Sequence, residues 1–449
     1  PAFADDLARF RWHPAMLDVA ASLALYGRSG FVPAACRSVR LYRPLPARIF
    51  AHVTVTERSD RAIGADCRIC DDDGQVLVEL LGLLFLVAVP TAPDPKEAGA
   101  ELHRLVWEPM SVPSGAPHAA GSLLLLDDEN RDPLTLALES HASSRRPLPR
   151  RAEDRQAVAS AVVAQGIRRI AYRTAADEQP WWLPDLLRRI VRAGPTRPLH
   201  VTAIAPLPAE PSATLATGPL LCLPLEEPAI TAGVAYLDAV TDTTADALIA
   251  SLGEATGVYR IDGGGALSCQ RLAAIGKAAE RPAATIRADR GAVVISGGLG
   301  GMGLTLAEQI HRRTGATVVL LHRRERAPAD LRFAAYRCDV ADRAEVAQTF
   351  AAIRREFGPI QGVIHAAGIA GDGYLASRTE EEYRAVLAPK TDGTRNLHDE
   401  TLNDGLSFFV LASSRTALTG APSQSDYAAA NAYLNAFAGY RRRLGLPAT

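Results

Sequence analysis

GAVVISGGLGGMGLTLAEQI, residues 291–310, joins a short apolar run to a glycine-rich turn and a helical pattern. The run 292–295 predicts a buried strand, and Leu304, Ala307 and Ile310 follow helical spacing. Glycine lets the backbone approach a pyrophosphate, and the first amides and positive dipole end of a helix attract the anion. The order strand, tight turn, helix predicts a dinucleotide-binding βαβ unit, with a glycine-rich loop that binds nothing as the alternative.

Composition limits the class of protein. The 449 residues suffice for about three domains of ordinary size, and 48% of them are hydrophobic, enough for real cores. With 49 basic and 50 acidic residues the net charge is −1, so no overall field favours nucleic acid or an anionic membrane. The longest apolar run, 76–89, is interrupted by Glu79 and Gly82 and is too short to span a bilayer. A pair of buried strands explains it better.

Cysteine usage indicates the compartment. Six cysteines scattered through a long chain are not a disulfide framework, so a reducing cytoplasm is expected. Cys67 and Cys70 form a CxxC pair in an apparent strand, where their odd spacing places them on opposite faces. No second Cys or His pair follows nearby, and no metal site is predicted.

The chain divides into four segments. Residues 1–90 begin with a helical pattern and continue with strands that include an Asp-Gly hairpin turn at 73–74, which predicts a helix wrapped by an antiparallel sheet. Residues 91–101 are rich in proline, alanine and charge and read as a linker. Strands and helices alternate over 102–283 with no glycine fingerprint, so a mostly parallel sheet without a nucleotide is expected. Residues 284–449 carry the glycine turn.

Residues after the glycine turn indicate the form of the cofactor. The next strand ends at His322 and Arg323, where a basic residue suits the 2′-phosphate of NADP and an acidic residue would suit NAD. Arg323 and Arg324 therefore favour NADPH, and the alternative is a solvated basic run. A third strand ends at Asp339, placed to accept a hydrogen bond from the adenine amino group. A fourth, 360–368, ends in a loop of small residues beside which the cofactor's sugar could lie.

A second group of residues predicts acid–base chemistry beside the cofactor. Ser414 ends a strand, Tyr427 lies on the first turn of a helix, and Asn431 shares its face four residues later. A phenol ordinarily has a pKa of about 10 and needs a nearby cation to work as an acid and base at neutral pH. Lys390 is the candidate cation. The Ser414 hydroxyl can hold a substrate carbonyl while negative charge develops on its oxygen, and Tyr427 then donates the proton.

These residues resemble the short-chain dehydrogenase/reductase superfamily, and specifically the ketoreductase domain of polyketide synthases. The superfamily pattern TGxxxGxG is matched over 296–303 with Ser in place of Thr, and its NAAG-like strand end is matched by HAAG at 365–368. Most simple members carry Tyr and Lys four residues apart. Here Asn431 stands four residues after Tyr427 and Lys390 lies upstream, which is the arrangement typical of polyketide and fatty-acid ketoreductases.

The resemblance implies NADPH-dependent reduction of a β-ketoacyl thioester carried by an acyl carrier protein. Lys390 would support the phenolate of Tyr427 and hold the nicotinamide ribose, and Asn431 would complete a hydrogen-bonded relay. The LxxLVWEPM opening at 102–110 resembles the structural subdomain that precedes the catalytic one in these proteins. The residues implied for cofactor binding are Ser296, Gly297, Gly298, Leu299, Gly300, Gly301, Met302, Gly303, Arg323, Asp339, Val340, Ala366, Ala367 and Gly368.

The motif HPAMLD at 13–18 resembles the HPxLLD pattern in the second half of the double-hotdog dehydratase domain of the same synthases. Asp18 then matches the catalytic acid, and its His partner would lie upstream of Pro1; a helix-capping or solvated Asp is the alternative. Ser22 stands where that family usually has His or Gln, which weakens the case for dehydration. The predicted fold is therefore α/β, with two Rossmann-like units, structural then catalytic, preceded by an α+β hotdog fragment.

The chain departs from the family in three places. Of the Leu-Asp-Asp stereochemical motif, aligned at 370–372, only Asp372 matches, and Thr419 stands where the other type has Trp; this favours the D-hydroxy product. The segment 323–339 is short, so its usual crossover helix is expected to be lost or minimal. Relatives continue past the last residue with strands and a lid, so we expect 1–449 alone, as an excised piece, to reduce a ketoacyl thioester poorly or not at all.

Three other functions compete with reduction inside a synthase. A non-catalytic scaffold for the neighbouring domains would bind no NADPH, and the set Lys390, Ser414, Tyr427 and Asn431 argues against it. A dehydratase would need an upstream His close to Asp18. A free-standing reductase of small alcohols or ketones is disfavoured by the dehydratase-like remnant and the additional α/β unit. The leading hypothesis has an acyl carrier protein and neighbouring synthase domains as partners, without nucleic acid or membrane.

Overall fold

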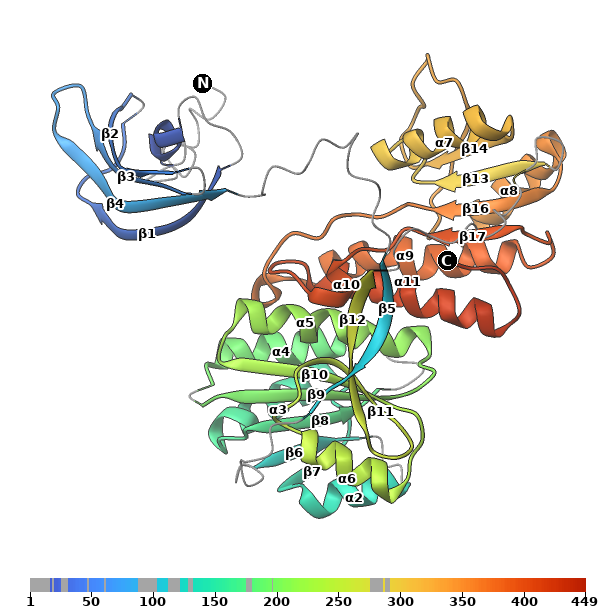
Figure 1. The fold of residues 1–449 in the computed structure, drawn as a ribbon, viewed down its shortest axis with the longest axis horizontal. Helices are drawn as coiled ribbons and strands as arrows, with labels where there is room; N and C mark the ends of the chain where they lie inside the picture. Colours follow the sequence, from blue (N-terminus) through green and yellow to red (C-terminus); the bar gives the residue numbers. More distant parts are fainter. Residues whose placement is uncertain are drawn as a thin grey trace. The chain divides into compact units, whose positions relative to one another are not determined.

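The chain folds into two compact units, Pro1–Glu101 and Leu102–Thr449, and each is described by itself (Figure 1). The computed structural model describes residues 17, 20–25, 31–46, 48–59, 62–87, 103–111, 122–127, 132–174, 180–195, 197–274, 286 and 291–449. None of the helices in these ranges is long and apolar enough to cross a membrane.

The first unit is an antiparallel sheet with a helical turn packed on it. Residues 20–22 are helical and continue into the 3-10 turn η2 (Leu23–Leu25), and Ala20 and Ala24 are buried in the core that this turn shares with the sheet. The sheet has the order β1-β4-β3-β2. Its strands are β1 (Phe31–Leu41), β2 (Phe50–Arg58), β3 (Ala62–Cys70) and β4 (Val76–Val87).

The apolar run predicted as a pair of strands is one strand, β4. It pairs with β1 on one side and with β3 on the other, so a long apolar run is accommodated at the centre of the sheet. Gly82 has a φ of +65° inside this strand, and its amide donates to Asp66 Oδ1 at 2.7 Å, so the glycine marks an irregularity and not a turn. The predicted hairpin turn at 73–74 joins β3 to β4, with Gly74 at φ +77°.

The second unit begins with an eight-stranded sheet, which we call the upstream half. Its order is β5-β12-β11-β10-β9-β8-β6-β7, mostly parallel, with β12 antiparallel to both neighbours. Its elements are β5 (His103–Pro109), β6 (Leu123–Leu126), α2 (Pro133–His141), β7 (Ser144–Arg146), α3 (Ala152–Ala164), β8 (Arg169–Arg173), α4 (Trp182–Ala193), β9 (Leu199–Pro206), η3 (Pro211–Ala216), α5 (Thr217–Glu226), β10 (Ile230–Leu237), α6 (Asp242–Ser251), β11 (Gly257–Ile261) and β12 (Leu267–Ala274).

Helices cover both faces of the upstream sheet because its strands are apolar on both sides. Alternate residues of β6 belong to different cores: Leu123 and Leu125 pack with α2 and α6, whereas Leu124 and Leu126 pack with α3 and α4. This is the layered α/β arrangement that the alternating strands and helices predict.

The downstream half is a parallel five-stranded sheet in the order β15-β14-β13-β16-β17. Its elements are β13 (Ala292–Ser296), α7 (Gly301–Thr314), β14 (Thr317–His322), β15 (Ala334–Arg337), α8 (Arg343–Phe357), β16 (Ile360–His365), η4 (Leu375–Ser377), α9 (Glu380–Glu400), β17 (Phe408–Leu411), α10 (Thr416–Thr419) and α11 (Ser425–Arg443). No helix connects β14 to β15, as the shortness of 323–339 predicts.

One hydrophobic core joins the two halves. Residues of α4 and α5 belong to the same buried cluster as residues of α9 and α11, and the rings of Trp181 and Tyr383 lie 5.4 Å apart across the junction. Helices α9, α10 and α11 lie between the two sheets in Figure 1. The two mostly parallel sheets confirm the predicted α/β class, and their shared core explains why they form a single unit.

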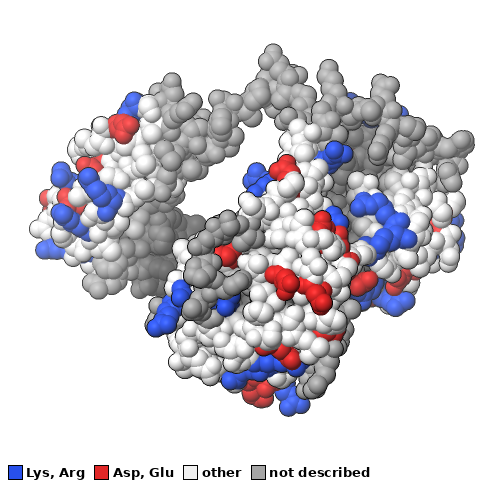
Figure 2. Space-filling model, turned by 60° about the horizontal axis from the view of Figure 1, so that its bottom comes forward, with Lys and Arg blue, Asp and Glu red and all other residues white. Residues whose placement is uncertain are grey.

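Figure 2 shows both acidic and basic side chains on the drawn surface of each compact unit. Neither unit presents charge of a single sign on this side, in keeping with the net charge of −1.

Candidate active site

The glycine turn between β13 and α7 is too tightly packed for a side chain at several of its glycines. Gly297 has a φ of +69°, and a Cβ at this position would lie 2.7 Å from the carbonyl oxygen of Ala366. A Cβ on Gly303 would lie 2.5 Å from the carbonyl oxygen of Gly297. Helix α7 begins behind Gly300, which has no side chain to cap it, so its first amides are available to an anion.

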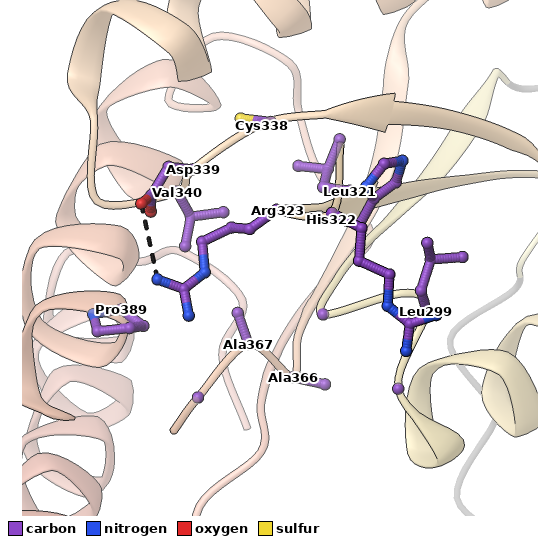
Figure 3. A pocket seen from close by; sticks show the side chains of 14 residues that line it. Leu299, Leu321, His322, Arg323, Cys338, Asp339, Val340, Ala366, Ala367 and Pro389 are labelled. Atoms are coloured by element: carbon purple, nitrogen blue, oxygen red, sulfur yellow. Dashed lines mark ion pairs between the residues drawn. The ribbon is translucent and has the colours of Figure 1, made fainter. Parts of the chain in front are cut away.

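A pocket opens in front of this turn, at the carboxyl ends of the parallel strands (Figure 3). Several residues predicted for the cofactor line it: Gly297, Leu299, Gly300, Arg323, Asp339, Val340, Ala366, Ala367 and Gly368. The lining also includes Leu321, His322, Arg324, Cys338 and Pro389. The turn, the strand ends and the small-residue loop therefore enclose one site, as the sequence predicts.

The remaining predicted residues lie outside the pocket lining: Ser296, Gly298, Gly301, Met302 and Gly303. Ser296 is fully buried and its hydroxyl lies 2.6 Å from His365 Nδ1, so it secures the turn from behind. A Cβ on Gly298 would lie 2.6 Å from Leu320 Cβ, so this glycine lets the turn pack on the sheet. Met302 is 61% exposed. Ser296 and Gly298 therefore shape the turn, whereas Gly301, Met302 and Gly303 form the first turn of α7.

Arg323 reaches across the pocket towards Asp339 (Figure 3). Arg323 Nη1 lies 3.8 Å from Asp339 Oδ2, and the two side chains are 53% and 37% exposed. An ion pair as exposed as this one adds little to the stability of the fold, so the guanidinium of Arg323 remains available to a phosphate. Asp339 Oδ1 accepts the Ala341 amide at 3.0 Å, which orients its carboxylate at the end of β15. The glycine cradle at one end and Arg323 at the other fit a dinucleotide.

Lys390 lies in the middle of α9, which starts at a capping box formed by Thr379 and Glu382. It is 3% exposed, and its Nζ donates to the carbonyl oxygen of Ala412 at 2.8 Å. The same Nζ lies 5.9 Å from the centroid of the Tyr427 ring. Burial lowers the pKa of Lys390 to about 8. The structure thus holds a buried ammonium group against the tyrosine ring.

Tyr427 and Asn431 occupy successive turns at the start of α11, as predicted. Asn431 Nδ2 donates to the Tyr427 carbonyl at 2.7 Å, while its Oδ1 is buried and has no hydrogen-bond partner among the described residues. Ser413 Oγ donates to the Asn431 carbonyl at 3.2 Å and ties the loop after β17 to this helix. The neighbouring Ser414 Oγ accepts from the Thr416 amide at 3.3 Å, which orients it within that loop.

His365 links parts of the site that the sequence patterns leave unconnected. Its Nδ1 lies 2.6 Å from Ser296 Oγ and its Nε2 lies 3.0 Å from the carbonyl oxygen of Pro389. Burial, reinforced by the charge of Lys390, lowers the pKa of His365 to about 3, so the ring is neutral and bonds once through each nitrogen. The sequence contains two signals of this role: His replaces Asn in the NAAG pattern, and Pro389 interrupts a helical pattern.

Arg378 and Asp426 form a buried ion pair that the sequence analysis missed. Arg378 is 8% exposed and Asp426 is fully buried, and Arg378 Nε donates to Asp426 Oδ2 at 2.9 Å. Arg378 Nη1 also donates to the carbonyl oxygen of Asp372 at 3.2 Å. Asp372, predicted for stereocontrol, is itself exposed. The pair therefore connects the loop after β16 to the residue directly before Tyr427.

The remaining residues that the sequence analysis singled out belong to the first unit. Asp18 lies outside the described residues. Cys67 and Cys70 lie on β3, where Cys67 is buried and Cys70 is half-buried. All six cysteines are free thiols, and the described parts of the chain contain no group of three or more His, Cys, Asp or Glu that could hold a metal ion.

Over residues 291–449 the chain matches the family model described as the KR domain. This part of the chain is a KR domain. Residues 1–93 match the model described as the polyketide synthase dehydratase N-terminal domain, which confirms the resemblance to a dehydratase. The motif HPAMLD predicts the second half of such a domain, whereas that description names the N-terminal one, so the choice of half stays a prediction.

Related proteins and structures place the KR domain among modular polyketide synthases. The phenolphthiocerol synthesis polyketide synthase Pks15/1 of Mycobacterium bovis is 43% identical over 169 residues, which are 35% of this chain and 8% of that protein. Erythronolide synthase EryA2 of Saccharopolyspora erythraea is 41% identical over 171 residues, 35% of this chain and 5% of that protein. The chain thus spans less than a tenth of the length of either relative.

A solved structure of A-type ketoreductases from a modular polyketide synthase covers 77% of this chain and 82% of its own, with a TM-score of 0.66 and 27% identity. An N-terminal ketoreductase from the macrolactin assembly line covers 78% of this chain and 82% of its own, with a TM-score of 0.65, and at 19% identity it shows the fold alone. The upstream half, which lies outside the KR family match, is therefore part of the same ketoreductase fold.

Proposed function

We propose that this KR domain reduces a β-ketoacyl thioester, carried by an acyl carrier protein, to the β-hydroxyacyl thioester with NADPH. The observation that carries the proposal is the buried Lys390 ammonium, 5.9 Å from the Tyr427 ring and behind the glycine-lined pocket. A cation next to a phenol at a dinucleotide pocket is the arrangement needed to protonate an alkoxide as it forms. The reducing cytoplasm suits a protein whose cysteines are all free thiols.

The residues that line the pocket support NADPH as the cofactor. The glycine turn and the start of α7 would hold the pyrophosphate, and Arg323 would bind the 2′-phosphate that distinguishes NADPH from NADH. Asp339 would accept a hydrogen bond from the adenine amino group. When bound, NADPH supplies the hydride for the β-carbon.

The site residues account for the proton and the carbonyl. The Ser414 hydroxyl holds the ketone oxygen, and Tyr427 donates its proton to that oxygen as negative charge develops. Lys390 stabilises the phenolate that results. Asn431 Oδ1, a buried acceptor without a partner among the described residues, is the position at which a proton relay would continue. The exposed Asp372 would favour the D-hydroxy product from the loop after β16.

The test has two steps with one variant. First, NADPH is titrated into this chain and its fluorescence is followed; the proposal expects binding that Tyr427→Phe preserves, since the phenol contributes to chemistry and not to the pyrophosphate site. Second, NADPH oxidation is measured with a β-ketoacyl thioester in the synthase module that carries this domain. Tyr427→Phe should abolish turnover. Absence of NADPH binding would support a scaffold, and full turnover by Tyr427→Phe would overturn the proposed chemistry.

A further inference from the structure

Helix α5 of the upstream half lies directly along the segment 420–429, which leads into α11. A Cβ on Gly218 of α5 would lie 2.6 Å from Ala429 Cβ and would come even closer to backbone atoms of Ser425 and Ala429. A Cβ on Gly420 would lie 2.5 Å from the carbonyl oxygen of Leu221. The two backbones approach this closely only because both positions are glycine. The start of α11 therefore rests on α5.

Glu226, the last residue of α5, binds two loops of the downstream half at once. Its Oε2 accepts the Leu375 amide at 2.8 Å, and its Oε1 accepts the Ser423 amide at 2.9 Å. The first amide ends the loop that follows β16, and the second precedes α11. Each carboxylate oxygen serves one loop, so a single side chain sets the spacing between them.

Ser423 is held in a conformation that serine disfavours. Its φ is +63°, and it is the one non-glycine residue with positive φ in the described part of the chain. Its amide donates to Glu226, and its carbonyl oxygen accepts the Gly373 amide at 3.2 Å. Such strain persists only where the surroundings over-determine the backbone, and it clusters at functional sites. Here the surroundings include a carboxylate from the upstream half.

Both loops held by Glu226 adjoin the proposed chemistry. Ser423 lies four residues before Tyr427, and Leu375 lies three residues after Asp372. The Arg378–Asp426 pair already ties these loops to each other within the downstream half. Glu226 adds the link from the loops to the upstream sheet.

We propose that Glu226 is a positioning residue for ketone reduction: its carboxylate holds the Tyr427 helix and the 371–375 loop at one spacing, so that the bound ketone presents one face. This inference rests on the proposed function. It gives the upstream half, which has no glycine fingerprint, a direct part in the geometry of the site.

The chemistry of the contact defines the test. A carboxylate accepts both amides, whereas Gln keeps one acceptor oxygen and turns an NH₂ group towards the other amide. Glu226→Gln should therefore release one loop with almost no change in volume. Glu227→Gln is the matched control, because Glu227 directly follows Glu226 and neither loop amide bonds to it. Glu226→Asp keeps both acceptor oxygens on a stem one methylene shorter and should restore part of the effect.

The first measurement does not depend on activity. Hydrogen–deuterium exchange of this chain should become faster over 371–378 and 420–428 in Glu226→Gln, and should stay at the wild-type rate in Glu227→Gln. The second measurement uses the synthase module. Glu226→Gln should lower kcat on the order of 10-fold to 100-fold, because misplacement of a proton donor by about 1 Å has an effect of that size. The ratio of hydroxy diastereomers should fall, while the Kd for NADPH stays unchanged.

Exchange rates and kcat in Glu226→Gln equal to those of Glu227→Gln would overturn the positioning role and leave the reductase proposal intact. Full turnover by Tyr427→Phe would instead refute the proposed chemistry whatever Glu226 does. If Glu226→Gln fails to fold, Glu226→Asp decides the matter: unchanged exchange and an unchanged diastereomer ratio in that variant would overturn the role.

Discussion

Replacing Gly218 with alanine tests whether the spacing between α5 and α11 controls the site. The added Cβ would lie 2.6 Å from Ala429 Cβ and closer still to the backbone at Ser425, whereas ordinary contacts begin at 3.4 Å. The neighbours are mostly backbone and cannot rotate away, so the two helices must separate by about 1 Å. That displacement falls at the start of α11, seven residues or fewer from Tyr427 and Asn431.

Two effects of opposite sign determine how much Gly218→Ala changes the free energy of unfolding. Replacing a helical glycine with alanine stabilises by about 0.5–1 kcal/mol, because the unfolded chain loses less freedom on folding. Forcing a methyl group into a packed interface costs about 1–3 kcal/mol, and a clash with backbone belongs at the upper end of this range. We expect Gly218→Ala to destabilise by about 2 kcal/mol net. For a unit of this size that lowers Tm by roughly 3 °C.

The assay compares two glycine-to-alanine variants of this chain by scanning calorimetry. Gly439 lies near the end of α11, and a Cβ there would have Arg443 Nη1 as its nearest neighbour at 3.7 Å, an ordinary contact with a flexible side chain. Gly439→Ala should therefore raise Tm by about 1 °C, opposite in sign to Gly218→Ala. In the synthase module, Gly218→Ala should also lower kcat on the order of 10-fold or more. A Tm at or above wild type for Gly218→Ala, with full kcat, would refute the reasoning.

Three further perturbations follow from the same site. Arg378→Met leaves the fully buried Asp426 without its partner and should lower the free energy of unfolding by about 3–5 kcal/mol, part of which Asp426→Asn in the same chain should recover. Strict additivity in urea unfolding of the wild type, the two single variants and the double variant would contradict a direct coupling. Arg323→Ala should weaken NADPH binding about tenfold and leave NADH binding unchanged, and an equal loss for both cofactors would argue against a 2′-phosphate contact. Burial lowers the pKa of Lys390 to about 8, so its positive charge is present below that pH and is lost as the pH rises through it. We therefore expect kcat to fall above about pH 8. A kcat that stays constant across that range would count against the role of the lysine.

Local sequence patterns were sufficient to predict the strands and helices that carry the candidate site residues. The strand, turn and helix at 291–310 follow from apolar periodicity and glycine content within one short window, and the structure has β13, the turn and α7 there. Tyr427 and Asn431 share a face because helical geometry places residues four apart on successive turns. The absence of a helix between β14 and β15 follows from length, since 323–339 has too few residues for the usual crossover.

Patterns failed where a residue's role depends on its neighbours in space. The apolar run of β4 was split into two strands because a central strand and a strand pair have the same composition; only its pairing with both β1 and β3 distinguishes them. His365 was read as a variant of a loop motif, yet its two ring nitrogens connect Ser296 to the carbonyl of Pro389. No sequence pattern singled out Arg378 or Asp426, which form a buried pair.

The sequence by itself determined the α/β class and the order of strand, glycine turn and helix, and it singled out Lys390, Ser414 and Tyr427 as the proposed chemical groups, because each lies in a stretch short enough for local geometry to govern. Only the tertiary structure decided what holds those groups in place. Glu226 reaches amides 149 and 197 residues away along the chain, and contacts over such separations leave no periodic trace in a sequence. They arise when two sheets share one core, and the packing of α5 on α11 then selects which side chains meet.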